Sequence, residues 1–264
     1  MGVVKNSLVL AAAEALELSY YRRAALVTGT ADGIIESVRR RCPSTPAEVI
    51  TNGVDVTRFG PQCADEAARS LLGDPNQVTF IYAGVMGMAQ GLGLILDVAA
   101  AVRDLTQVQF VLVGEGAERE SLQRRIESDG LHNVRLVRPQ PKERIPALLA
   151  VSSVAFHVLK FSILGAVPSK IYEAMASGLP ILFAGGGEGA RRVQKAGAGL
   201  VVPYGDVRGL EKAVRWLTSD AALRRELGSA GRHAAEQLYS RKAIARRLHE
   251  LLLGVTQRSK DVRR

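Results

Sequence analysis

Short apolar runs alternate with helical patterns along most of the chain. The runs are rich in valine and isoleucine and apolar at nearly every position, which is typical of strands buried on both faces of a parallel sheet. This alternation predicts an α/β protein with a doubly wound parallel sheet. The predicted strands are 25–28, 48–52, 78–83, 109–113, 134–138, 154–159, 181–184 and 199–203, and the predicted helices are 8–22, 64–72, 92–104, 116–129, 142–150, 169–177, 188–196, 206–218, 220–237 and 241–253.

A turn-rich connector separates the first 50 residues from the regular alternation. The segment before it is too small to be an independent domain, so we interpret it as the remnant of one. Its first helix then lacks the sheet that it would cover, and we expect Leu8, Leu16 and Leu18 to be exposed, or covered by the C-terminal helices or by a second copy of the chain. The predicted units are 1–50 (remnant), 51–62 (linker), 63–240 (main α/β domain) and 241–264 (C-terminal helix and basic tail).

The composition is that of an ordinary globular protein, with 47% hydrophobic and 23% charged residues. Cys42 and Cys63 are too few for a disulfide framework and have no metal-ligand spacing, so we expect a reducing, cytoplasmic compartment. The early apolar run 8–13 is followed by Glu14 and Glu17, and it is too short and too charged for a signal peptide or a membrane span.

The net charge of +9 is unevenly placed. Residues 241–264 carry eight Lys or Arg against Glu250 and Asp261, and Arg22, Arg23 and 39–41 form a second basic cluster. With only 5% aromatic residues the chain lacks the basic, aromatic-rich patch of a nucleic-acid binder. The basic residues near both ends of the chain are better explained by contact with the anionic inner face of a membrane. The alternative is that they simply form a solvated surface.

Residues 167–178 (VPSKIYEAMASG) hold the most informative pattern. A proline is preset for the first turn of a helix, and Ser169 and Lys170 follow it there. Free N–H groups and a lysine at a helix start suit an anion, while Glu173, one turn later, offers two acceptor oxygens for a pair of hydroxyls. The spacing predicts a nucleotide-sugar site, although a capped amphipathic helix with a solvated lysine fits it equally well.

Two glycine-rich turns follow predicted strands. Gly84 and Gly87, with Gln90 after them, allow a ligand to approach the backbone, or serve only as a tight strand–helix turn. The turn Gly114-Glu115-Gly116 does not fit a dinucleotide fingerprint, because an arginine stands at the third glycine position and the glutamate would repel a pyrophosphate. We interpret that second turn as structural.

No catalytic pattern of a familiar hydrolase, nucleotide-triphosphate-binding or metal-dependent class is present. The four histidines have no acid or nucleophile at a useful spacing, and we interpret His157, in a predicted strand, as a hydrogen-bonded core residue. We therefore expect neither a metal nor another cofactor.

In order along the chain, these segments resemble the donor-binding half of a GT-B retaining glycosyltransferase of the group-one family. The likeness spans about residues 14–256. Several separate motifs in the right order identify the family more specifically than any single motif does. The segments that carry it are 51–55 with Phe59 and Pro61 (interdomain linker), 82–91 (donor-phosphate loop), 112–116 (glycine turn), 133–138 (strand end facing the base), and 168–178 with 185–188 (nucleotide-sugar signature).

The sequence departs from the family pattern at three positions. Of two glutamates often seven residues apart, Glu173 matches the second and Gly165 stands in place of the first. Val85 and Gln90 stand where the family often has an arginine and a lysine, which weakens the usual cationic clamp on the diphosphate. The Ser-Lys before Glu173 is similar to a branch that builds bacterial O-antigens and capsules, often from UDP-linked N-acetyl sugars.

The resemblance implies a nucleotide-sugar-binding, Rossmann-like domain of a hexosyltransferase. Lys170, Ser169 and the N–H groups after Val167 would face the phosphates, Glu173 the ribose, and the Arg138 backbone the base. Gly84, Val85, Gly87 and Gln90 would form the other wall. The catalytic candidates are Lys170 and Glu173, and the donor-binding candidates are Gly84, Val85, Gly87, Gln90, Arg138, Val167, Pro168, Ser169, Lys170 and Glu173.

Complete members of the family carry an N-terminal acceptor domain, and catalysis takes place between the two domains. The implied partners are therefore a nucleotide-sugar donor and an acceptor domain or partner chain, with a homo-oligomer as a further interpretation. The chain would then be a fragment, a sequence with a misassigned start, or one subunit of a split enzyme. Two other function classes stay open, namely an inactive nucleotide-binding or assembly subunit and a nucleotide-sugar epimerase.

Overall fold

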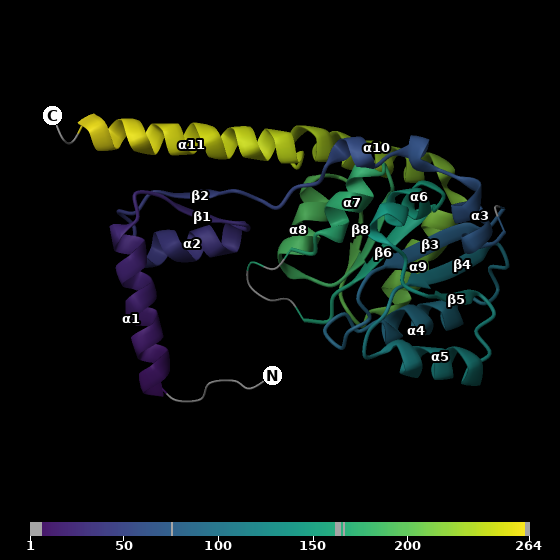
Figure 1. The fold of residues 1–264 in the computed structure, drawn as a ribbon. Helices are drawn as coiled ribbons and strands as arrows, with labels where there is room; N and C mark the ends of the chain where they lie inside the picture. The colour runs from purple at the N-terminus through teal and green to yellow at the C-terminus, as the bar shows by residue number, and fades with distance from the viewer. Residues whose placement is uncertain (1–6, 75, 162–164, 166, 262–264) are drawn as a thin grey trace.

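The structure is a computed structural model that describes residues 7–74, 76–161, 165 and 167–261. Its main part is a six-stranded parallel sheet in the order β5-β4-β3-β6-β7-β8, with helices on both faces (Figure 1). The strands are β3 (Val78–Ala83), β4 (Val108–Val113), β5 (Val134–Val137), β6 (Val154–Val158), β7 (Ile181–Ala184) and β8 (Gly199–Val202). The predicted doubly wound sheet is confirmed.

The order of these strands reverses between β3 and β6, which pair side by side through Phe80 and Ile81. From β3 the chain builds outward through β4 to β5, and it then returns to place β6 on the other side of β3. Loops that leave the carboxyl ends of two such neighbouring strands turn to opposite faces of the sheet, which opens a crevice between them.

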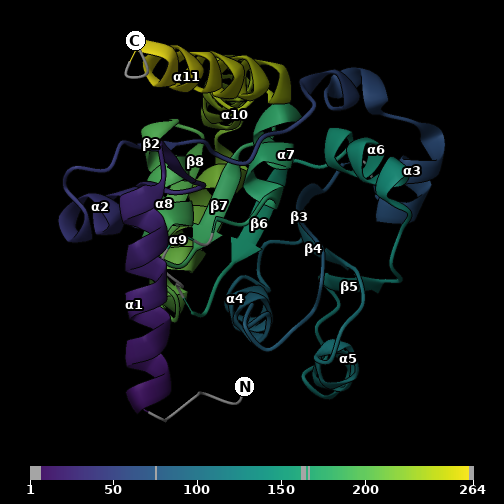
Figure 2. The ribbon, with the colours of Figure 1, turned by 60° about the vertical axis from the view of Figure 1, so that its left-hand side comes forward.

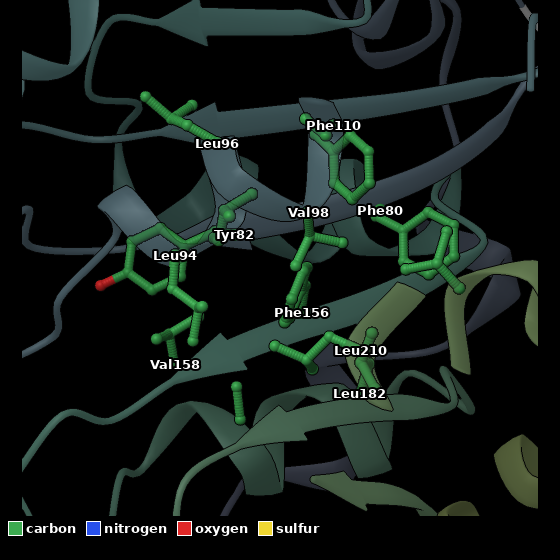
Figure 3. Packing of buried hydrophobic residues seen from close by; sticks show 14 of the residues in the cluster. Phe80, Tyr82, Leu94, Leu96, Val98, Phe110, Phe156, Val158, Leu182 and Leu210 are labelled. Carbon is green, nitrogen blue, oxygen red and sulfur yellow. The ribbon is translucent and has the colours of Figure 1, made fainter. Parts of the chain in front are cut away.

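Each face of the sheet is covered by a layer of helices. One core lies under α4 (Gly93–Ala101), α5 (Arg119–Ser128) and α9 (Val207–Ser219), and it includes a stacked Phe80–Phe110 pair with ring centroids 5.4 Å apart (Figure 3). The helices of the opposite face are α3 (Glu66–Leu72), α6 (Ile145–Ala150), α7 (Lys170–Ala176), α8 (Gly187–Lys195) and α10 (Ala221–Gln237).

Residues 7–50 form a small unit with its own two-stranded sheet. Two parallel strands, β1 (Val27–Gly29) and β2 (Ala47–Val49), flank α2 (Asp32–Arg41) and share a core of only a few side chains. The preceding helix α1 (Ser7–Arg23) buries none of its residues. Leu8 and Leu16 of this helix are 79% and 57% exposed, as we expected for a helix without its sheet.

Helix α11 (Arg241–Asp261) leaves the main domain and passes along β2 (Figures 1 and 2). It continues eight residues beyond the predicted end at residue 253, and Arg247 pairs with Glu48 of the small unit at 3.2 Å. The linker, which contains the short 3₁₀ helices η1 (Val56–Arg58) and η2 (Pro61–Cys63), pairs with the residues just before α11. Helix α11 therefore ties the small unit to the main domain.

A second contact joins the two parts. The carboxylate of Glu188, at the start of α8, accepts a hydrogen bond from the backbone N–H of Gly33 at 2.9 Å. One turn later Arg192 donates to Asp32 at 3.0 Å. Because these groups meet at the N-terminus of α2, the acceptor oxygens of Glu188 also satisfy a backbone donor that lacks a partner within the helix.

Arg232 fastens the linker to the main domain. Its Nη1 donates to the carbonyl oxygens of Phe59, at 2.8 Å, and of Ala176 at the end of α7. We expect Arg232→Met to lower the free energy of unfolding by about 1–3 kcal/mol, because two carbonyls lose their charged donor while the apolar stem is kept.

Urea unfolding measures this loss. The matched control is Arg225→Met on the exposed side of the same helix, which should change the free energy of unfolding by less than about 0.5 kcal/mol. Equal unfolding midpoints for the two variants would contradict the assigned role of Arg232.

Candidate functional site

A cavity of about 570 Å³ opens at the carboxyl ends of β3 and β4, on the side of the sheet covered by α7. This is the place where open α/β sheets bind ligands, beside the point at which the strand order reverses. Its walls come from the linker, the turns after β3, β4 and β5, the start of α7 and the first residue of α11. The lining residues are Gly53, Val54, Asp55, Arg58, Phe59, Ala83, Gly84, Val85, Val113, Gly114, Glu115, Pro139, Gln140, Lys142, Ile145, Ser169, Lys170, Glu173 and Arg241.

Helix α7 places Lys170 and Glu173 on one face toward the cavity. Ile171, Tyr172 and Met175 are buried in the core beneath the sheet, so the opposite side of the helix faces outward. Pro168 begins the first turn, because its carbonyl oxygen accepts a hydrogen bond from the N–H of Ile171 at 3.2 Å. The predicted helix start is confirmed, whereas the Ser169 side chain forms no capping hydrogen bond.

The end of α7 is also as the sequence predicts. Gly178 adopts a left-handed φ of +69°, and its N–H bonds to the carbonyl of Met175 at 3.0 Å. The N–H of Leu179 bonds to the carbonyl of Ala174 at 3.0 Å, which completes the glycine-type helix end. The buried strand β7 then begins at Ile181.

Lys170 lies half-buried across the turn that follows β3. A side chain at Gly84 would overlap the Cε atom of Lys170, so the absence of a Cβ at this position makes room for the lysine. Among the described residues, no carboxylate lies within 4.0 Å of its ammonium group and no acceptor bonds to it. The arrangement leaves a positive charge available at the floor of the cavity.

Glu173 is the half-buried acid of the same face. Burial raises the pKa of its carboxyl group, and the nearby charges of Lys170, Arg241 and Arg58 act in the opposite direction. Its oxygens accept no hydrogen bond from any described residue. A fixed carboxylate of this kind can accept hydrogen bonds from two hydroxyl groups of a ligand.

The turns after β3 and β4 support each other. Gly84 N–H donates to the carbonyl of Val113 at 2.8 Å, and Met86 N–H donates to that of Glu115 at 2.8 Å. Gly114 has a φ of +153°, and a Cβ there would overlap the carbonyl oxygen of Gly84. The second turn is therefore structural, as we interpreted it, and it also forms part of the cavity wall.

The structure brings half of the predicted donor-binding residues to the cavity. Gly84, Val85, Ser169, Lys170 and Glu173 line it. The other five lie outside the lining set, and their roles stay predictions. Two of these five, Gly87 and Gln90, are joined by a hydrogen bond of 3.0 Å from the N–H of Gln90 to the carbonyl of Gly87. The carbonyl of Arg138 accepts a hydrogen bond from the side chain of Gln140. Val167 packs on the core, and Pro168 lies in the first turn of α7.

Sequence reasoning missed three cationic side chains of the cavity. Arg58 comes from η1, Lys142 from the short 3₁₀ helix η3 (Lys142–Arg144), and Arg241 from the first position of α11. No local pattern marks them, because the linker and α11 meet only through contacts between distant parts of the chain. Gln140 and Ile145, from the segment after β5, complete the same side of the cavity.

The interpretation of His157 as a hydrogen-bonded core residue is wrong in one respect. The side chain is buried in β6, but its Nε2 atom has no hydrogen-bond partner. Burial, together with the smaller effect of the positive charge of Lys170, lowers the pKa of His157 to about 3. The imidazole is therefore neutral near pH 7.

No helix of the described residues is long and apolar enough to cross a membrane. Peripheral contact through the basic ends stays a prediction. The predicted domain boundaries and the self-association of the chain likewise stay predictions.

A comparison with protein families matches residues 64–234 to the model described as "Glycosyl transferases group 1". A GDP-mannose-dependent alpha-(1-6)-phosphatidylinositol monomannoside mannosyltransferase of Mycolicibacterium smegmatis is 30% identical over 221 residues, which are 80% of this chain and 57% of that protein. The chain thus spans little more than half the length of this relative.

Solved structures show the same fold. Sucrose-phosphate synthase from Thermosynechococcus elongatus superposes with a TM-score of 0.74 at 23% identity, over 96% of this chain and 64% of that one. The Anabaena protein HepE in complex with UDP superposes with a TM-score of 0.78 at 21% identity, over 89% of this chain and 65% of that one. The expected GT-B, Rossmann-like fold is confirmed.

The buried histidine predicts a pH dependence of stability. Below about pH 6.5 the unfolded chain binds a proton at residue 157 that the folded chain does not bind until about pH 3. The free energy of unfolding should therefore fall by up to about 1.4 kcal/mol per pH unit as the pH decreases through this range. We expect His157→Leu to lose this part of the slope.

Urea unfolding between pH 7 and pH 4 tests the expectation. The exposed His249, changed to Gln, is the control and should keep the wild-type slope. The same slope in His157→Leu as in the wild type would show that the folded state does protonate this histidine.

Proposed function

The chain belongs to the family of group 1 glycosyl transferases, and we propose that it forms the donor-binding half of a transferase that uses a nucleotide-sugar. The observation that carries the proposal is the pair of unpartnered charges on one face of α7. Lys170 and Glu173 both face a cavity at the reversal of strand order, where nothing in the described protein neutralises either of them at short range.

Lys170 is the residue that we assign to the donor phosphates. When the glycosidic bond breaks, negative charge grows on the diphosphate that leaves. A positive charge already held in place stabilises this state more than the ground state, which lowers the barrier. Ser169 and Gly84, which line the same part of the cavity, leave backbone groups close to this position.

Glu173 is the residue that we assign to the ribose. The two oxygens of a carboxylate can accept hydrogen bonds from neighbouring hydroxyl groups, and its distance from Lys170 is one helical turn. The base would then lie toward the end of β5, near Pro139 and Gln140, with the backbone of Arg138 behind it.

We propose a UDP-linked sugar, such as an N-acetyl hexose, as the donor. The HepE structure contains UDP, whereas the mycobacterial relative is named as dependent on GDP-mannose, so GDP is the competing nucleotide. Transfer with retention of configuration to a glycan or lipid-linked acceptor of a bacterial surface polysaccharide is part of the same proposal. The cations of the cavity support binding without a metal ion.

A second candidate function is a nucleotide-binding subunit that acts only with a partner chain. The specific observation that favours it is α1, whose apolar residues are exposed in a chain that spans little more than half of its mycobacterial relative. An acceptor-binding domain on a partner chain would complete the cleft in that case.

The assignment of Lys170 predicts a loss of affinity. Lys170→Ala should weaken binding of UDP by about 1.5–3 kcal/mol, the range for a hydrogen bond to a charged group. Calorimetry measures the change, with and without a chelator in the buffer. Lys212→Ala, at an exposed position of α9, is the matched control and should bind UDP as the wild type does. Binding that the chelator abolishes would refute the metal-independent site.

The assignment of Glu173 predicts a selective loss. Glu173→Gln should weaken UDP more than inorganic pyrophosphate, because only UDP offers ribose hydroxyls to the carboxylate. Competition calorimetry with the two ligands gives the comparison, and the exposed Glu226→Gln serves as control. Losses of the same size on both ligands would remove the ribose role from Glu173.

A further inference from the structure

Three exposed cations line the cavity together with Lys170, and we call them the rim cations. They are Arg58, Lys142 and Arg241, whereas Lys170 and Glu173 are half-buried. The rim cations come from the linker, η3 and the start of α11, and all three act on the charge of Glu173. Four positive charges therefore surround one ligand-sized space.

None of the rim cations has a carboxylate partner within 4.0 Å among the described residues. Some other arginines do pair with acids, as Arg215 does with Asp104 at 2.7 Å and Arg144 with Asp65 at 2.6 Å. Like charges that share a site repel each other, so cations without an acid at short range have an electrostatic cost in the free protein. An anionic ligand would relieve that cost.

Three acids, Asp55, Glu115 and Glu173, line the same cavity and leave a net excess of one positive charge. Asp55 accepts hydrogen bonds from both the N–H and the Oγ of Thr57, at 3.1 and 2.7 Å. Glu115 pairs with Arg119 at 3.7 Å, on the far side of the turn after β4. Neither acid lies within 4.0 Å of a rim cation.

Arg241 is held so that the end of its side chain stays available. Its backbone N–H donates to the carbonyl of Val54 at 3.0 Å, and its Nε donates to that of Gly53 at 3.3 Å. Gly53 packs so closely that a Cβ there would lie 2.5 Å from Ile244 Cδ1. The two terminal nitrogens of the guanidinium have no partner among the described residues, and they can form two parallel hydrogen bonds to a phosphate.

The turn after β3 contributes no cation of its own to the cavity lining. Val85, on this turn, is 63% exposed and apolar, and the cation that lies against the turn is Lys170 from α7. Both Arg58 and Arg241 lie outside residues 64–234, the part of the chain that matches the family model. The matched family model therefore does not cover these two arginines.

We propose that Arg58 and Arg241 bind the diphosphate of the nucleotide-sugar together with Lys170. The clamp on the phosphates then comes from the linker and α11 instead of the turn after β3. This inference rests on the proposed function of the cavity. Because the linker and α11 also join the small N-terminal unit to the main domain, a bound diphosphate draws together the elements that set the position of that unit.

The experiment compares UDP, UMP and uridine on the full chain by calorimetry. Arg58→Gln and Arg241→Gln should each weaken UDP about tenfold, which corresponds to about 1.4 kcal/mol, with a smaller loss for UMP and none for uridine. Arg241→Lys should restore part of the affinity. The control is Arg208→Gln, an exposed arginine of α9 that lies outside the cavity, and it should leave all three affinities unchanged.

Two outcomes would overturn the inference. Wild-type affinity for UDP in both variants, with melting temperatures that confirm folding, would show that the arginines are only solvated. Equal losses for UDP and uridine would show that they act through the ionisation of Glu173. If Lys170→Ala still weakens UDP in either case, the proposed donor site stands and only the rim assignment fails, whereas no effect of Lys170→Ala would remove the donor site itself.

Discussion

The pairing of the linker with the residues that precede α11 is the contact on which the cavity depends. The N–H of Val54 donates to the carbonyl of Tyr239 at 2.8 Å, and the N–H of Arg241 donates back to Val54 at 3.0 Å. These two bonds form a parallel bridge between segments at opposite ends of the main domain. Without the bridge, the rim arginines would have no fixed position over α7, and the cavity would be open on that side.

The bridge itself is supported by packing rather than by further hydrogen-bonded strands. Val54 and Tyr239 are buried in the same core as α7, and the rings of Tyr239 and Tyr172 lie 4.8 Å apart. Burial of this much apolar surface outweighs the mutual repulsion of a few exposed cations, which water screens strongly. The fold can therefore keep these charges without acid partners at the site.

Local sequence patterns predict the sheet and much of the site, for a physical reason. A strand buried on both faces is apolar throughout, so β3 and β7 were predicted at their observed bounds. Helix α7 was predicted because its start, its buried face and its glycine end all lie within about ten consecutive residues. The orphaned Nε2 of His157 could not be predicted, since hydrogen-bond partners depend on what packs against the strand. The meeting of Arg58 with Arg241 depends on a long-range bridge that leaves no periodic pattern.

None of residues 7–50 lines the cavity, but the contacts between the two parts of the chain involve elements next to those that do. Glu188 and Arg192 of α8 bind the start of α2, while α11 follows β2 on the other side. Helix α8 follows α7 through β7, so a shift of the small unit would act on the elements beside Lys170 and Glu173. Truncation of the chain to residues 64–234, the part that matches the family model, would remove Arg58 and Arg241 together with the bridge that holds them. The smallest piece that can carry the complete cavity therefore includes the linker and the start of α11.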